Sequence, residues 1–210
     1  MLGTEGWDVG AERSEAVGEG PKRPATYEDL LALPEHVVGQ IIDGELVVMP
    51  RPANPHAIAN SRLQGELYGP FERGRGGPGG WQLVVEPELH FGRDVLVPDL
   101  AGWRRERLPE VPPEPYFTLA PDWVCEVLSP STEVVDRVKK KRIYAREGVE
   151  HIWLVNPNAR TLEVFRLSGG QWVELGTYSG DERVRAEPFE ALELELGVLW
   201  LSPEQSPKTP

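Results

Sequence analysis

Two acidic residues interrupt segments that otherwise read as buried strands, and they are the first candidates for chemistry. Asp99 follows a proline in VLVPDLAGW, and Glu126 lies 27 positions later in DWVCEVL. Because a buried carboxylate without a compensating charge is costly, each of them needs a partner. If the two strands are neighbours, the carboxylates converge and repel each other unless a divalent cation lies between them. We therefore expect Mg²⁺ or Mn²⁺, which can activate water and neutralise charge on a phosphodiester.

A basic helix follows Glu126 and offers the cation that such chemistry needs near the nucleophile. Residues 131–148 begin with capping residues and end at Gly148, as a helix does. Within ten residues they carry six basic side chains: Arg137, Lys139, Lys140, Lys141, Arg142 and Arg146. We expect DNA to contact this local basic patch, although a solvated helix face gives the same pattern.

The helical wheel does not select one lysine of this run. We expect the inward side of the helix to carry its apolar residues, Val134, Val138 and Ala145. Lys140 projects away from that side, whereas Lys141 lies nearer to it. Helix geometry therefore leaves Lys139, Lys140 and Lys141 as candidates.

The surrounding elements predict an α/β or α+β fold. Asp43-Gly44 stands between two β-branched runs, which is the strongest short hairpin signal. Residues 55–73 read as an amphipathic helix, and strand candidates follow in WQLVVEPELHFG, VLVPDLAGW and DWVCEVL. From Glu150 onward the pattern is an antiparallel meander. We expect one mixed, curved sheet flanked by helices, with additional antiparallel hairpins.

The ordered combination of these motifs resembles the PD-(D/E)XK nuclease superfamily, and more closely its Uma two family of restriction-endonuclease-like proteins. The resemblance covers roughly residues 25 to 200. It rests on IIDGELVVMPRP followed by His56, then VPDL, EVLSPST, the spaced set Asp136, Lys140 and Tyr144, and GVEHIWLVNP. The resemblance implies a restriction-endonuclease-like core and a metal-dependent endonuclease that hydrolyses phosphodiester bonds of DNA.

The same resemblance implies roles for particular residues. Asp99 and Glu126 would hold the metal ion together with the carbonyl of Val127. The superfamily's standard lysine, two positions after the glutamate, is Leu128 here. The Uma two pattern supplies the lysine from the following helix, and Lys140 matches that position.

Three further residues are accessory candidates. Gln40 stands where relatives commonly carry a glutamate, while Glu45 keeps the other acidic position. Glu45 and His56 could orient a ligand, bind the metal from outside or carry a proton. Tyr144, from the spaced set, is the third accessory candidate.

The same residues also have structural interpretations. Glu126 could form a salt bridge to an arginine of the proline-rich loop, and Asp99 could shape a Pro-Asp turn. Asp136 and Lys140 form an i,i+4 pair that could only stabilise a helix, and Tyr144 could pack on the core. The competing function is a catalytically silent module that keeps the nuclease fold and binds a partner or nucleic acid. The acidic net charge and the displaced lysine favour it.

The overall charge restricts where nucleic acid could bind. The chain has a formal net charge of −12 at pH 7, whereas nucleic-acid-binding proteins usually present a basic footprint. DNA binding must therefore rest on the patch from Arg137 to Arg146. The sequence has neither a run of 18 apolar residues nor a signal peptide. We expect a cytoplasmic protein without membrane association, and a homodimer is a possible assembly.

Composition also predicts the domain organisation. Residues 1–24 and 202–210 have little apolar periodicity and are predicted to be a disordered and a flexible tail. Residues 25–201 are expected to form a single nuclease-like domain. The one cysteine, Cys125, excludes an internal disulfide, and strand alternation places it on the face opposite Glu126.

Overall fold

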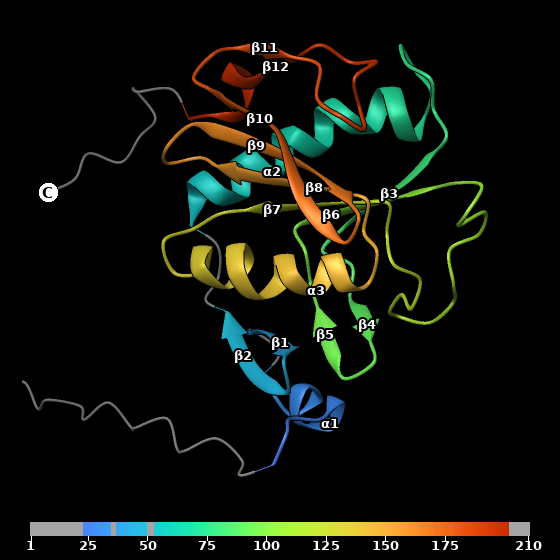
Figure 1. Cartoon of the computed structure of the whole chain (residues 1–210), viewed down its shortest axis with the longest axis vertical. Coiled ribbons are helices and arrows are strands. Elements are labelled where there is room, and N and C mark those ends of the chain that lie inside the picture. The colour runs from blue at the N-terminus through green and yellow to red at the C-terminus, as the bar shows by residue number, and fades with distance from the viewer. Residues whose placement is uncertain (1–22, 35–36, 50–52, 202–210) are drawn as a thin grey trace, which may run out of the picture.

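The structure is a computed structural model that describes residues 23–34, 37–49 and 53–201 (Figure 1). The predicted tails, residues 1–24 and 202–210, lie outside the described residues apart from Arg23 and Pro24. The helices are α1 (Tyr27–Leu31), α2 (Asn54–Leu67) and α3 (Lys141–Arg146), with the π-helical turns η1 (Tyr68–Glu72) and η2 (Val135–Lys140) and the 3-10 helix η3 (Leu196–Leu199). No helix in the described ranges is long and apolar enough to cross a membrane.

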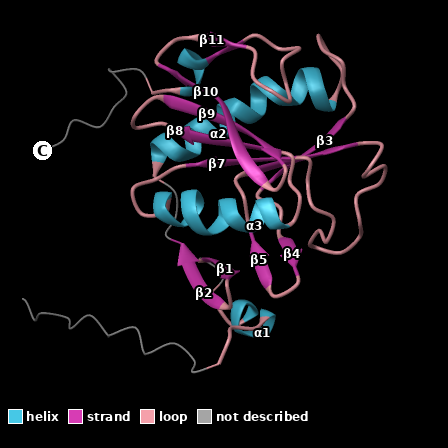
Figure 2. Ribbon diagram, viewed as in Figure 1, coloured by secondary structure: helices cyan, strands magenta, loops and turns pink. Residues whose placement is uncertain are grey.

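Strands form three sheets, which Figure 2 shows with the helices. The four-stranded sheet has the order β2-β1-β5-β4, with β1 (Val38–Ile42), β2 (Glu45–Met49), β4 (Leu89–Phe91) and β5 (Asp94–Leu96). The six-stranded sheet has the order β10-β9-β8-β7-β6-β3, with β3 (Trp81–Val85), β6 (Leu100–Arg104), β7 (Trp123–Val127), β8 (His151–Asn156), β9 (Thr161–Ser168) and β10 (Gln171–Ser179). A small hairpin consists of β11 (Arg183–Val184) and β12 (Leu194–Glu195).

The six-stranded sheet is mixed because a helix separates two of its strands. β7 and β8 are parallel and joined by η2 and α3, while the other pairings in this sheet are antiparallel. Every residue of β7 is buried, and so is every residue of β8 except Asn156. Such continuous burial is typical of central strands that are covered on both faces. The predicted mixed sheet is therefore confirmed, and the meander from Glu150 is confirmed through β10. The last expected strand instead pairs with β11 in the separate hairpin.

The expectation of a single sheet was wrong, because two of the expected strands break at prolines. WQLVVEPELHFG divides into β3 and β4 around Glu86, which has a φ of +46°, and Pro87. VLVPDLAGW divides into β5 and β6 around Pro98 and Asp99. Proline cannot donate a ladder hydrogen bond, so a central strand cannot continue through it. The two breaks meet where the Glu86 N–H donates to the Asp99 carbonyl at 3.0 Å.

The predicted hairpin at Asp43-Gly44 is confirmed. Ile42 pairs with Glu45 at the end of the β1–β2 ladder, which leaves two residues in the turn. Asp43 has a φ of +56° and Gly44 a φ of +79°. Two positive φ values define the type I′ turn, which matches the twist of an antiparallel hairpin.

Helices cover opposite faces of the six-stranded sheet (Figure 1). On one face α2 packs Leu63 and Leu67 against alternate residues of β7, including Cys125. On the other face α3 packs Ile143 and Tyr144 against the remaining residues of β7 and β8. Cys125 and Glu126 therefore lie on opposite faces, as alternation predicts.

The inward side expected for the basic helix was wrong. Val134 and Val138 are 74% and 61% exposed. The buried residues are instead spaced as one face of a helix, and they are Asp136, Lys140, Ile143 and Tyr144. Ion pairs compensate the two charges on this face, and it is the face that covers Glu126.

Candidate active site

Asp99 lies at the break between β5 and β6, where its carboxylate bridges two elements. Its Oδ2 accepts the backbone N–H of Val127 at 2.7 Å. Its Oδ1 lies 3.2 Å from Nε2 of His56, in the first turn of α2. Because β6 and β7 are neighbours, Asp99 lies beside the end of the strand that carries Glu126. The predicted proximity of the two strands is thus present.

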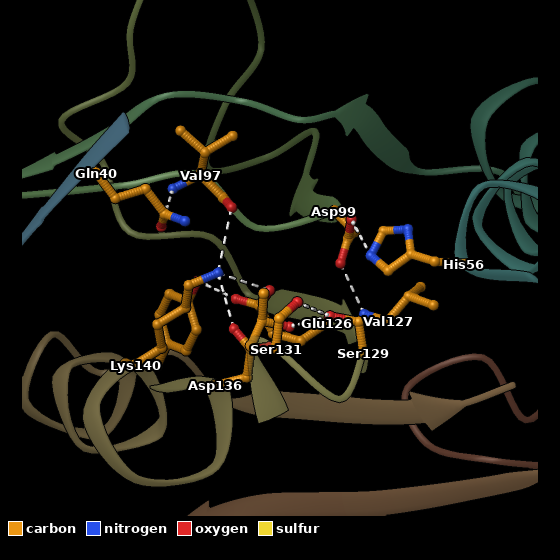
Figure 3. A network of polar contacts seen from close by, with 12 residues as sticks. Gln40, His56, Val97, Asp99, Glu126, Val127, Ser129, Ser131, Asp136 and Lys140 are labelled. Carbon is orange, nitrogen blue, oxygen red and sulfur yellow. Dashed lines mark hydrogen bonds and ion pairs between the residues drawn. The ribbon is translucent and has the colours of Figure 1, made fainter. Parts of the chain in front are cut away.

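Glu126 is the centre of a buried ion-pair network (Figure 3). Its Oε2 accepts from Lys140 Nζ at 2.9 Å, and its Oε1 accepts from the Tyr144 hydroxyl at 2.6 Å. Lys140 Nζ also lies 3.1 Å from Asp136 Oδ1 and 3.4 Å from the Val97 carbonyl oxygen. Glu126 is 1% exposed, and Lys140 and Asp136 are each 2% exposed. Glu126 therefore pairs with a helix lysine, not with an arginine of the proline-rich loop.

The geometry separates the three lysines that the sequence leaves open. Lys140 points into the network, whereas Lys139 Nζ pairs with Glu45 at 2.7 Å near the surface. Lys141 Nζ lies 3.2 Å from the ring centroid of Phe165 as a cation–π contact. Of the three, only Lys140 contacts Glu126.

A cavity of about 270 Å³ brings these groups together. Asp99, Glu126, Asp136 and Lys140 line it, and His56 lies at its side. Apolar residues line the rest of its wall, among them Val38, Met49, Val97 and Pro130. Charged groups from β7, from η2 and from the β5–β6 break thus share one largely apolar pocket, which is the usual setting of an active site.

Burial changes the acid–base properties of the network. Loss of hydration raises the pKa of Glu126 to about 8, because the nearby charge of Lys140 offsets it only in part. Burial lowers the pKa of Lys140, but the carboxylates of Glu126 and Asp136 raise it further, so the net shift is upward. Burial likewise lowers the pKa of His56, and the hydrogen bond and charge of Asp99 reverse the shift. Perturbed groups that converge in a pocket indicate a functional site.

The accessory candidates divide into two groups. His56 contacts Asp99, and Tyr144 contacts Glu126, so both support the central carboxylates. Glu45 is not brought to the cavity, because its side chain is 67% exposed and pairs with Lys139. Gln40 is buried at the cavity wall, where its Oε1 accepts the Val97 N–H at 2.9 Å.

Sequence reasoning missed part of the cavity. Asp136 had been recognised only as a helix pair and a family motif, yet it is a buried partner of Lys140. Glu86 lines the cavity from the first strand break, and its position before a proline was the available signal. Ser129 also lines it, with its hydroxyl 3.0 Å from those of Ser131 and Thr132 in the SPST turn after β7.

The donor types of the predicted ligand set are those that a divalent cation would take. In the described part of the chain no group of three His, Cys, Asp or Glu side chains is arranged to hold a metal. The predicted set uses two carboxylates and one carbonyl, and oxygen ligands of this kind suit Mg²⁺ or Mn²⁺. The N–H and C=O of a strand residue point toward the same neighbour, so the Val127 carbonyl faces the Asp99 side. Asp99, Glu126 and Val127 are thus the residues that would hold the ion.

The basic helix carries paired charges. Arg137 bonds Glu133 at 2.7 Å and Glu163 at 2.5 Å. The other exposed cations of the helix, Lys139, Arg142 and Arg146, each contact an acidic side chain as well. DNA binding by this helix stays a prediction, and phosphates would have to compete with these carboxylates.

The fold is mixed α/β, with a six-stranded mixed sheet. It is similar to a crystal structure described as a putative nuclease belonging to DUF820 from Anabaena variabilis, with a TM-score of 0.66 and 24% sequence identity. The match covers 84% of this chain and 97% of that one. The search of curated proteins gave no match.

The family assignment comes from the sequence. The model of the Uma2 family, described as "Putative restriction endonuclease", matches residues 25–198. The chain therefore belongs to the Uma2 family, as the motif resemblance predicts.

Proposed function

We propose that the protein is a divalent-metal-dependent endonuclease that hydrolyses phosphodiester bonds of DNA. The observation that carries the proposal is the convergence of Asp99, Glu126 and Lys140 at one cavity, from three separate elements. Membership of the Uma2 family supports the same reaction class. The proposed reaction is therefore the attack of water on a phosphodiester of DNA.

The chain's own residues would divide the work. Asp99 and Glu126, with the Val127 carbonyl, would hold Mg²⁺ or Mn²⁺, and such an ion would supply Lewis-acid chemistry at the scissile phosphate and a lowered pKa of water. Lys140 orients the attacking water and stabilises developing negative charge. His56 fixes the Asp99 carboxylate from the α2 side.

A catalytically silent module is the second candidate. Both oxygens of Glu126 already accept hydrogen bonds, from Lys140 and Tyr144. In a silent module this network would serve only the stability of the fold. The absence of Mg²⁺- or Mn²⁺-dependent nicking by the purified full chain, on plasmid and on single-stranded DNA, would favour this candidate.

The decisive variant is Lys140→Met, which keeps much of the side-chain length and removes the charge. We expect single-turnover cleavage at saturating Mg²⁺ to fall by about 10² or more, as when a preorganised donor is lost. Lys139→Ala and Lys141→Ala are controls from the same helix, and they should keep the wild-type cleavage rate when the enzyme is present at a concentration that saturates the DNA, even if Lys139→Ala binds DNA more weakly. Equal rates in all three variants would exclude a catalytic lysine in this run.

Burial of Lys140 requires a second variant. Removing one partner of a buried ion pair can destabilise a protein by about 3–5 kcal/mol, so Lys140→Met could lose activity by unfolding. Glu126→Gln is nearly isosteric, the Tyr144 hydroxyl can still donate to the amide oxygen, and Lys140 keeps Asp136 as a charged partner. We expect this variant to stay folded by circular dichroism, to bind Mg²⁺ more weakly in calorimetry and to lose cleavage. A folded Glu126→Gln variant with normal cleavage would refute the proposed site.

A further inference from the structure

One face of the basic helix is occupied by acidic side chains of the four-stranded sheet. Lys139, Arg142 and Arg146 are spaced i, i+3 and i+7, which places them on the same face. We call these three residues the basic row. They pair with Glu45 at 2.7 Å, Asp43 at 2.5 Å and Asp94 at 2.8 Å, respectively.

Two of the three acidic partners can be displaced easily. The side chains of Glu45 and Arg142 are exposed, and those of Lys139 and Asp43 are at the limit of exposure. Exposed ion pairs contribute only about 0.2–1 kcal/mol each. Asp94 differs, because it is buried and also accepts the Asp43 N–H at 2.6 Å. Glu45 and Asp43 can therefore release their partners by side-chain rotation alone, without movement of the sheet.

The basic row lies beside the candidate active site. Lys139 precedes Lys140, which lines the cavity, and β1 contributes Gln40 to the same cavity. In Figure 1 helix α3 lies beside the β1–β2 and β4–β5 hairpins, which carry the acidic partners. A nucleic-acid backbone that replaced those carboxylates would therefore run next to the cavity.

We propose that the basic row binds the phosphates of DNA and that Asp43 and Glu45 occupy it in the free protein. The carboxylates of Asp43 and Glu45 then compete with DNA phosphates for Arg142 and Lys139, which lie one turn apart on the helix. Binding exchanges weak exposed ion pairs for phosphate contacts and releases counterions from the DNA. The inference rests on the proposed function, because it assumes that nucleic acid is the substrate, and it adds how access to the site is regulated.

The test is a double variant that neutralises the competitors without altering the fold. Asp43→Asn keeps the type I′ turn, since Asn-Gly is a preferred dipeptide there. Glu45→Gln preserves the side-chain shape at the start of β2. The matched control is Asp181→Asn with Glu195→Gln, which makes the same charge change. These acids pair with Arg160 and Arg183, and β12 packs on the α2 side of the molecule.

Binding of a fluorescent DNA duplex is measured by anisotropy with the full chain in metal-free buffer. We expect the Asp43→Asn/Glu45→Gln protein to bind about twofold to thirtyfold more tightly than the control, from two released ion pairs. The gain should shrink as salt is raised, because salt screens the exposed pairs in the wild type. Affinity equal to that of the control variant would overturn the proposal.

The same proteins separate this inference from the nuclease activity. One outcome is that the double variant binds DNA more tightly while none of the three proteins, wild type, double variant or control, cleaves DNA with Mg²⁺. This outcome would support DNA binding by the basic row and refute the proposed nuclease activity. Mg²⁺-dependent cleavage by the wild type with no gain in affinity in the double variant would refute the competition and retain the nuclease.

Discussion

At the scale of single residues, the candidate site is a set of buried ionisable groups that contact one another. Glu126 accepts hydrogen bonds from Lys140 and Tyr144, while Asp99 contacts His56 and accepts the Val127 N–H. A buried pair of this kind is weak evidence for stability, because the desolvation penalty can exceed the Coulombic gain. Because its ionisable groups are buried, we expect the network to respond to pH.

The free energy of unfolding should fall as pH rises between about 5 and 8 in metal-free buffer. The pKa of Glu126 moves from an ordinary value of 4.5 to about 8 on folding. The folded state therefore holds this proton to higher pH than the unfolded state, and stability falls wherever the folded state binds more protons. Urea unfolding at several pH values measures the effect.

Glu126→Gln is the control for this pH dependence. The amide does not titrate, so the variant should lose the part of the pH dependence that comes from Glu126. An unchanged slope between pH 5 and 8 in the variant would mean that another group titrates in this range. In the wild type, Mg²⁺ should bind more tightly as pH approaches 8, because the ligand is the ionised carboxylate.

At the scale of elements, the sequence predicted some parts of the site well and others poorly. The hairpin at Asp43-Gly44 and the neighbouring strands of Asp99 and Glu126 were predictable, because turn chemistry and strand runs are local signals. The face of the basic helix was not, because exposed Val134 suggested an apolar side while the true inner face carries Asp136 and Lys140. Lys140 is buried because it pairs with Glu126, which lies 14 positions earlier in the sequence. A local hydrophobic pattern does not contain this contact, so it assigns the wrong face of the helix to the interior.

The breaks at Pro87 and Pro98 show a second limit of local patterns. A chain segment that crosses from one sheet to another keeps its alternation of apolar and polar residues, so this hydrophobic pattern does not reveal the crossing. The only local signal is the proline, which marks both crossings here. Asp99 could be predicted as a candidate ligand, but its place between two sheets could not.

The corrected helix face can be tested by two substitutions to alanine. Ile143→Ala should lower the free energy of unfolding by about 2–5 kcal/mol, because Ile143 is buried against the sheet. Val138→Ala should be neutral or stabilising by a few tenths of a kcal/mol, because Val138 is 61% exposed and alanine favours a helix. Urea denaturation gives both values. A large loss for Val138→Ala would restore the inward side that the sequence suggests.

At the scale of the whole molecule, the protein is acidic and carries the basic row next to its four-stranded and six-stranded sheets. The net charge of −12 repels DNA at a distance, so productive binding must occur at a small positive surface close to the cavity. Hydrophobic residues of both sheets, such as Leu96 and Trp103, lie in the same core cluster. The sheets are thus packed together, and regulation by side-chain exchange is more consistent with this packing than is rotation of a domain.

DNA binding should weaken steeply with salt, in proportion to the phosphates contacted. If the basic row neutralises three phosphates, the slope of log K against log salt should be about −2.7 for duplex DNA. Arg142→Gln should reduce the magnitude of that slope by about 1. Arg160→Gln is the control, since Arg160 pairs with Asp181 outside the row. A salt titration of DNA affinity gives each slope, and an equal effect of the two variants would place the contacts elsewhere.

The single cysteine gives this chain an internal reporter for the strand that carries Glu126. Cys125 is fully buried, and burial raises the pKa of its thiol well above the ordinary value, so it is inert toward thiol reagents while β7 is in place. A reagent can modify it only when β7 opens locally or the chain unfolds. The rate of thiol modification therefore measures how often β7, the strand that carries Glu126, opens locally, without any engineered label.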